Sequence, residues 1–203
     1  MIESGAAWLA AFAAGAQAAG LSERVAVILG LCYILLAIRQ HRACWIAGGA
    51  STAVYIAVLV KAGLFLLAAL QVFYVVLSIY GWLAWREGGA LAGRPQSWPL
   101  SRHLLAVLVV LLATAASTPL LARFTDAPAP LADSLGTWAS VVATWLLARR
   151  YLETWFWWML IDSGLVVLFA SQGLAFTAGL HLAYGVLAIV GWRAWRRSLL
   201  ETA

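Results

Sequence analysis

LQVFYVVLSIYGWLAWR, the stretch Leu70–Arg86, occurs twice in this chain. Its second copy, LHLAYGVLAIVGWRAWR, stands at Leu180–Arg196, at a constant offset of 110 residues and without a gap. Extending the alignment upstream to Gly63 gives 13 identities in 24 positions, and Trp45 and Trp155 pair at the same offset. A self-match at a fixed period over this length indicates a duplicated structural unit.

The composition is that of a membrane protein. The chain is 65% hydrophobic and 10% charged, whereas soluble domains carry about 25% charged residues. Its mean hydropathy is +0.92, and apolar runs of about 20 residues, long enough to span a hydrocarbon core, recur along it. Residues 1–20 lack the basic segment of a signal peptide. We therefore expect an all-α membrane protein whose residues 1–21 form a short helix at the membrane interface.

Seven apolar spans follow this N-terminal segment. They fall at about 22–38, 45–60, 64–85, 101–122, 135–148, 155–171 and 174–195. The spans divide the chain into a first three-helix repeat (22–86), a linker with the fourth span (87–133), a second three-helix repeat (134–197) and a tail (198–203).

Basic residues predict the orientation, because cytoplasmic loops carry an excess of Lys and Arg. With seven spans, ten of the 13 basic residues share the side of the C-terminus: Arg39, Arg42, Arg86, Arg94, Arg102, Arg149, Arg150, Arg193, Arg196 and Arg197. The other side has Arg24, Lys61 and Arg123. The C-terminus is therefore expected in the cytoplasm and the N-terminus outside. Both repeat copies end on the basic side, so the units are parallel and the fourth helix links them in a 3+1+3 arrangement.

Polar residues inside the spans are candidates for a binding site, because parallel repeats of this kind occur in transporters that hold their substrate near mid-membrane. Gln71 and His181 occupy the same position in the two copies, and Tyr74 and Tyr184 follow one helical turn later. Each polar residue could instead bridge two helices by a hydrogen bond. The matched pairs favour a shared pocket.

Asp162 is the one acidic residue deep inside a predicted span, and Trp158 and Trp155 precede it on one helical stripe. An aspartate here could be held by a buried arginine or by backbone groups, but no arginine lies in mid-span. Aromatic rings beside a carboxylate suit a flat heteroaromatic cation. We therefore expect Trp155, Trp158 and Asp162 to contact a ligand.

Two other sets of repeated residues have structural interpretations. Four tryptophans next to arginines at the span ends are typical of an interfacial aromatic belt: Trp82, Trp85, Trp192 and Trp195. Gly81 and Gly191 are expected at close contacts between helices.

These motifs resemble the nicotinamide riboside transporter family, the PnuC-type vitamin transporters. The similarity covers nearly the whole chain beyond about residue 22 and is carried by Arg39–Gly48, Tyr55, Gln71–Trp85, Glu153–Asp162 and Gly173–Trp195. Its most specific part is Trp-x-x-Trp-x-x-x-Asp; Thr154 stands where many members have Asn.

The resemblance implies a fold similar to SWEET-type sugar transporters and facilitated diffusion of a vitamin precursor, trapped afterwards by a separate cytoplasmic kinase. Relatives carry nicotinamide riboside, thiamine or riboflavin. Asp162 favours the two cationic cargoes, nicotinamide riboside first. The expected substrate-binding residues are Gln71, Tyr74, Trp155, Trp158, Asp162, His181 and Tyr184.

Other classes of protein fit the sequence less well. A PQ-loop sugar carrier would need Pro-Gln pairs within its spans, but Pro95-Gln96 lies in a loop. Catalytic clusters, metal motifs and nucleotide-binding loops are absent from the sequence, so we predict no enzyme, no cofactor and no metal. The positive-inside rule accounts for the basic residues without nucleic acid. A non-transporting assembly subunit is the alternative of another class. The expected location is the bacterial inner membrane, and homo-oligomerisation is left open.

Overall fold

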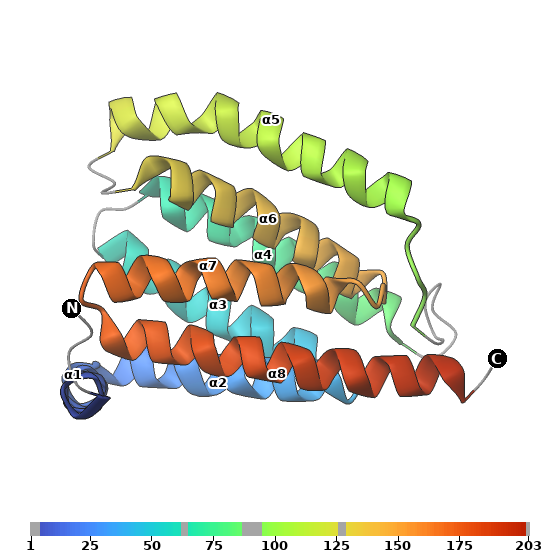
Figure 1. Ribbon diagram of the computed structural model, residues 1–203, viewed down its shortest axis with the longest axis horizontal. Helices are drawn as coiled ribbons and strands as arrows, with labels where there is room; N and C mark the ends of the chain where they lie inside the picture. Colours follow the sequence, from blue (N-terminus) through green and yellow to red (C-terminus); the bar gives the residue numbers. More distant parts are fainter. Residues whose placement is uncertain (1–4, 62–64, 87–94, 126–128, 202–203) are drawn as a thin grey trace.

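The computed structural model describes residues 5–61, 65–86, 95–125 and 129–201. This part of the chain forms eight helices (Figure 1). They are α1 (Gly5–Ala18), α2 (Leu21–Ile38), α3 (Cys44–Lys61), α4 (Phe65–Ala84), α5 (Leu100–Phe124), α6 (Pro130–Ala148), α7 (Thr154–Ser171) and α8 (Ala175–Leu200).

The boundaries follow the predicted spans, with two differences. Helix α6 begins at Pro130, five residues earlier than the predicted 135, because proline suits the first turn of a helix. Helix α8 continues to Leu200 instead of 195, with Arg197 in its last turn, where a positive charge complements the helix dipole.

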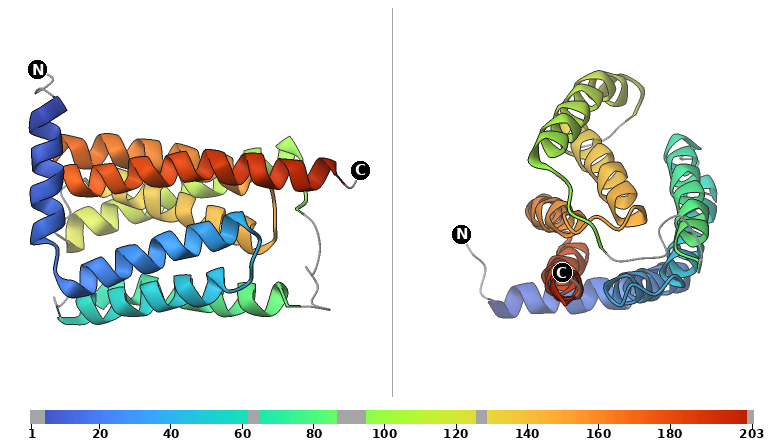
Figure 2. Two further views of the ribbon diagram at one scale, coloured as in Figure 1. Left: turned by 90° about the horizontal axis from the view of Figure 1, so that it is seen from below. Right: turned by 90° about the vertical axis from the view of Figure 1, so that its right-hand side faces the viewer.

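Helices α2 to α8 run along the long axis of the molecule, whereas α1 lies across their end (Figure 2). Helix α1 packs on the start of α8, where the rings of Phe12 and Phe176 are 5.3 Å apart. The short N-terminal helix is therefore present. Its position at a membrane interface stays a prediction.

The helices pack in two groups of three, α2–α3–α4 and α6–α7–α8 (Figure 2). Two contacts join the groups: α2 packs against α8, and α4 packs against α6. Helix α5 packs mainly on α6 and also contacts α7, where Trp157 hydrogen-bonds His103.

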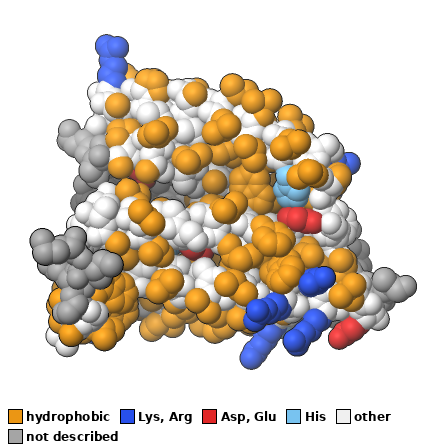
Figure 3. All heavy atoms as spheres, viewed as in Figure 1, with side chains coloured by type: hydrophobic (Ala, Val, Ile, Leu, Met, Phe, Trp, Pro, Cys, Tyr) orange, Lys and Arg blue, Asp and Glu red, His pale blue; other side chains and the backbone are white. Residues whose placement is uncertain are grey.

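The exterior agrees with a membrane environment. Helices α5 to α8 are long and apolar enough to cross a membrane, and α2, α3 and α4 contain shorter described apolar stretches. Hydrophobic side chains are spread over the face seen in Figure 3, and Lys and Arg side chains gather on it near the end of α8. The predicted class, an all-α membrane protein, is confirmed.

A core of tryptophans lies at the basic end of the bundle. The rings of Trp45 and Trp85 meet edge to face at 5.5 Å and 87°, and those of Trp155 and Trp195 meet at 5.5 Å and 88°. A Cβ atom on Gly81 would overlap the Trp45 ring. One on Gly191 would lie 2.6 Å from the Trp155 ring. The close packing predicted for both glycines is confirmed.

The prediction that Trp85 and Trp195 belong to an aromatic belt is wrong. Both rings are buried, and each indole crosses to the other helix group: Trp85 Nε1 donates to the carbonyl of Ala148 at 2.9 Å, and Trp195 Nε1 to that of Ala37 at 3.1 Å. The glycine one turn earlier on each helix makes room for the partner ring of the pair, Trp45 beside Gly81 and Trp155 beside Gly191.

Their neighbours Trp82 and Trp192 are only partly buried. The guanidinium of Arg42 lies 4.1 Å from the Trp82 ring and that of Arg196 lies 5.2 Å from the Trp192 ring. These two rings have the partly exposed, arginine-covered environment expected of tryptophans at a membrane surface.

Tight turns join the first and second helices of each group in the same way. Gln40 and Arg150, 110 residues apart, both adopt left-handed backbone angles, with φ of 55° and 57°. Such angles are uncommon outside glycine. Arg150 Nη1 also donates to Oε1 of Gln40 at 3.3 Å, so the two turns touch.

The segment before α5 is held against the second of these turns. Gln96 donates its backbone N–H to the carbonyl of Arg150 and accepts from the N–H of Leu152, both at 2.8 Å. The carboxylate of Glu153 accepts from the Trp98 N–H at 3.0 Å and from the Ser97 hydroxyl. The glutamate of the family motif thus fixes the linker to the second helix group.

Candidate functional site

A cavity of about 190 Å³ lies between the two helix groups, beside the tryptophan core. Five of the seven predicted site residues line it: Trp155, Trp158, Asp162, His181 and Tyr184. They come from α7 and α8, which pack closely along their length. Helix α2 forms the opposite wall with Gly30, Tyr33, Ile34 and Ala37, and α6 adds Leu147.

Gln71 and Tyr74 lie on α4 and do not line this cavity. Both side chains are half-buried, and Tyr74 hydrogen-bonds the side chain of Ser140 on α6. The shared pocket predicted from the Gln71 and His181 pair is not seen, since only His181 faces the cavity.

Asp162 has a partner that its sequence position did not reveal. Its Oδ1 lies 2.9 Å from Nδ1 of His181 on the neighbouring helix. Asp162 is almost completely buried, at 3% exposure, whereas the His181 side chain is 20% exposed. Among the described residues no arginine lies within ion-pair distance of Asp162, so the histidine and not an arginine holds the aspartate.

Two aromatic rings fix the imidazole of His181. Phe169 stacks on it with ring centres 5.3 Å apart and an interplanar angle of 14°. Tyr184 meets it edge to face at 5.9 Å and 80°. Together with the bond to Asp162, these contacts leave the ring little freedom to reorient.

The two predicted tryptophans differ in exposure. Trp155 is 1% exposed and wedged against Gly191, while Trp158 is partly exposed in the cavity wall. Trp155 Nε1 is buried and makes no hydrogen bond within the described residues. Trp158 is therefore the tryptophan that a ligand in the cavity can stack on, whereas the Trp155 indole N–H is inaccessible to a ligand.

No sequence pattern pointed to the cavity residues on α2. Tyr33 lines the cavity with its ring edge-on to Trp45, at 6.2 Å and 64°. Gly30 faces Tyr184, because a Cβ there would lie 2.7 Å from the tyrosine hydroxyl. Only the packing of α2 on α8 brings these residues to the site.

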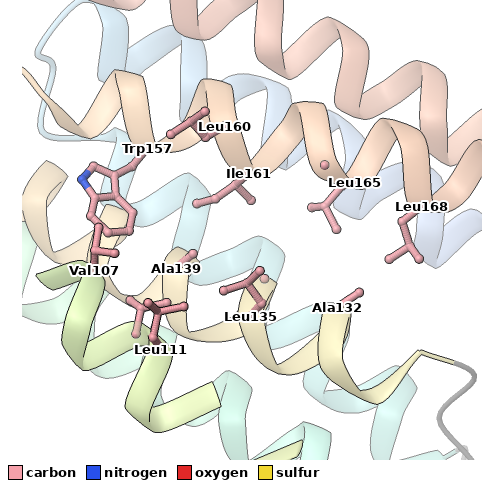
Figure 4. A pocket seen from close by; sticks show the side chains of 13 residues that line it. Val107, Leu111, Ala132, Leu135, Ala139, Trp157, Leu160, Ile161, Leu165 and Leu168 are labelled. Atoms are coloured by element: carbon pink, nitrogen blue, oxygen red, sulfur yellow. The ribbon is translucent and has the colours of Figure 1, made fainter. Parts of the chain in front are cut away.

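A second cavity, of about 300 Å³, opens between α5, α6 and α7 (Figure 4). Its walls are apolar side chains such as Leu111, Leu135 and Leu165. Its one polar side-chain atom, Trp157 Nε1, donates to Nδ1 of His103 at 3.2 Å. No charged group lines it within the described residues, so a polar cargo would find no partner there.

The family is decided by comparison with known sequences. Residues 20–197 match the family model described as nicotinamide mononucleotide transporter. The chain belongs to this family. The predicted relationship to PnuC-type transporters is thereby confirmed.

Two relatives of this chain differ in the cargo that their names state. The nicotinamide riboside transporter PnuC of Escherichia coli is 28% identical over 206 residues, covering 88% of this chain and 86% of PnuC. The riboflavin/roseoflavin transporter RibM of Streptomyces davaonensis is 28% identical over 186 residues, covering 86% and 84%. These relatives are transporters by name, in agreement with the prediction that the chain is no enzyme.

The fold is also that of a solved structure. The crystal structure of the vitamin B3 transporter PnuC superposes with a TM-score of 0.69 and 19% sequence identity, covering 94% of this chain and 91% of the other. At this identity the likeness establishes the fold and leaves the cargo to be argued from the site.

Proposed function

We propose that this protein is a facilitator that carries a cationic vitamin precursor, nicotinamide riboside first, across the bacterial inner membrane. The observation that carries the proposal is the cavity between the helix groups, where the Trp158 ring and the Asp162–His181 pair meet. An ionisable pair inside a membrane-embedded cavity is typical of a substrate pathway.

The site suits a flat ring with a positive charge. Nicotinamide riboside has a pyridinium ring that can stack on Trp158 while Asp162 supplies the opposite charge. His181 Nε2 is available to its carboxamide or ribose hydroxyls. Thiamine, with its thiazolium, is the alternative. Riboflavin is neutral and leaves the charge of Asp162 without a counterpart, although RibM is as similar to this chain as PnuC is.

We also propose that α2–α4 and α6–α8 are parallel repeats linked by α5, in seven spans. Supporting this are the two matching contacts between the groups, the two tryptophan pairs of equal geometry and the two left-handed turns. The arginines at the end of α8 then lie in the cytoplasm. A reporter fused after Ala203 is expected to be active in its cytoplasmic form; activity in a periplasmic form would contradict the orientation.

Transport should run down the cargo gradient, with trapping by a separate cytoplasmic kinase. The experiment is uptake of nicotinamide riboside, thiamine and riboflavin into proteoliposomes without ATP or ion gradients. We expect nicotinamide riboside to reach equal concentrations inside and outside. Accumulation above equality would contradict facilitated diffusion, and uptake of riboflavin alone would contradict the cationic cargo.

A further inference from the structure

In the Asp162–His181 pair, the second ring nitrogen of His181, Nε2, is not used in the bond between the two residues. His181 uses Nδ1 for the bond to Asp162, and Phe169 and Tyr184 pack on the ring. Its Nε2 makes no hydrogen bond within the described residues, and the side chain lines the cavity. A proton can therefore be added to Nε2 without breaking any contact of the ring.

The charge of the cavity depends on that proton. Besides the pair, the titratable groups that line the cavity are Tyr33 on α2 and Tyr184 on α8, with Tyr55 on α3 in electrostatic range of Tyr184. Tyrosines carry no charge near neutral pH. No lysine or arginine lines the cavity within the described residues.

Two charge states of the pair follow. With Nε2 bare, ionised Asp162 and neutral His181 give the cavity a net charge of −1. With Nε2 protonated, imidazolium and carboxylate cancel, and the added proton lies on a group that lines the cavity. Because the site is shielded from water, a cationic ring distinguishes these states strongly.

We propose that Nε2 of His181 is a proton-binding site that competes with the cargo, so that binding of a cationic cargo releases a proton to solvent. This inference rests on the proposed function, because a neutral ring would not distinguish the two charge states. Because binding of the cation releases this proton, the linkage relation requires that lower pH weakens binding of the cation.

The test is calorimetric titration of the purified protein with nicotinamide riboside from about pH 5 to 8, the range in which histidine changes charge. Each titration is run in two buffers of different ionisation enthalpy, which reports the protons released. We expect affinity to rise with pH by up to about tenfold per unit, with up to about one proton released. Riboflavin, the neutral control, should release none if it binds.

Three variants test whether the released proton comes from His181. His181→Gln should bind without proton release and without pH dependence. Asp162→Asn keeps an acceptor for Nδ1 but removes the charge that stabilises the imidazolium. Its affinity should depend much more weakly on pH. This variant replaces His181→Gln in the test if His181→Gln does not bind the cargo. His41→Gln, at an exposed histidine in the α2–α3 turn, should behave as wild type.

The outcomes separate the two proposals. Binding of nicotinamide riboside by wild type with no dependence on pH or buffer would overturn the proton site and leave the cargo intact. Full proton release by His181→Gln would overturn the assignment to this residue. Failure of folded wild type to bind nicotinamide riboside at every pH would overturn both proposals.

Discussion

The two helix groups are alike at the basic end of the bundle and different halfway along it. At the basic end, each group contains an edge-to-face tryptophan pair of the same geometry, Trp45 with Trp85 and Trp155 with Trp195. A glycine packs against one ring of each pair. Halfway along, residues at the same offset of 110 have diverged. The second group has Trp158, Asp162 and His181 in α7 and α8. The corresponding residues of the first group, in α3 and α4, are Gly48, Thr52 and Gln71.

The difference separates structure from recognition. The matched tryptophans join the two groups, since each inner indole donates to a carbonyl of the other group. The unmatched residues Trp158, Asp162 and His181 line the cavity, together with Trp155 and Tyr184, which match Trp45 and Tyr74. All the polar side chains of the lining except Tyr33 come from the second group. The matched tryptophans thus account for the contact between the groups, and the unmatched residues give the cavity its charged pair.

The largest expected effect on stability tests the tryptophan pairs that the two helix groups share. Gly81→Ala and Gly191→Ala each force a methyl group against a buried indole, and overpacking of this kind costs about 1–3 kcal/mol. Both variants should unfold at clearly lower temperature in detergent. The control is Gly164→Ala, where a Cβ has open space. An unchanged melting temperature for Gly191→Ala would contradict the packing.

The next effect is at most as large and tests the two hydrogen bonds that cross between the helix groups. Trp85→Phe and Trp195→Phe remove the crossing hydrogen bonds. Ala37 keeps the backbone N–H of Gln40 as a donor, at 2.9 Å. Losing a buried donor costs about 1–3 kcal/mol when the acceptor is left unpaired. We therefore expect Trp85→Phe to lower the stability more than Trp195→Phe does. The reverse order in thermal melts would show that the carbonyls do not matter.

The smallest effect concerns the outer tryptophans. Trp82→Phe and Trp192→Phe keep an aromatic face for Arg42 and Arg196 and weaken only a surface cation–π contact, worth about 0.5–1 kcal/mol. Melting temperatures close to wild type are expected. A loss as large as that of Trp85→Phe would remove the distinction between inner and outer rings.

Hydrophobicity and the repeat predicted the helices and the close contacts of Gly81 and Gly191, because both depend on local pattern. Trp85 could not be distinguished from a belt tryptophan, since an inward or outward indole beside arginine has the same sequence. The bond between Asp162 and His181 joins two helices, and Tyr33 enters the site from the other helix group. Such contacts depend on how helices pack, which spacing along one helix does not determine.

The central claim is that the cavity on the α2-facing side of α7 holds the cargo. Trp158 and Trp157 are adjacent on this helix but line different cavities. The measurement is calorimetric titration of nicotinamide riboside into wild type, Trp158→Ala and Trp157→Ala. We expect Trp158→Ala to bind about ten- to a hundredfold more weakly, from loss of about 2 kcal/mol of stacking and cation–π contact, and Trp157→Ala to bind as wild type. Wild-type affinity in folded Trp158→Ala, with the loss in Trp157→Ala instead, would place the cargo in the apolar cavity and contradict the account.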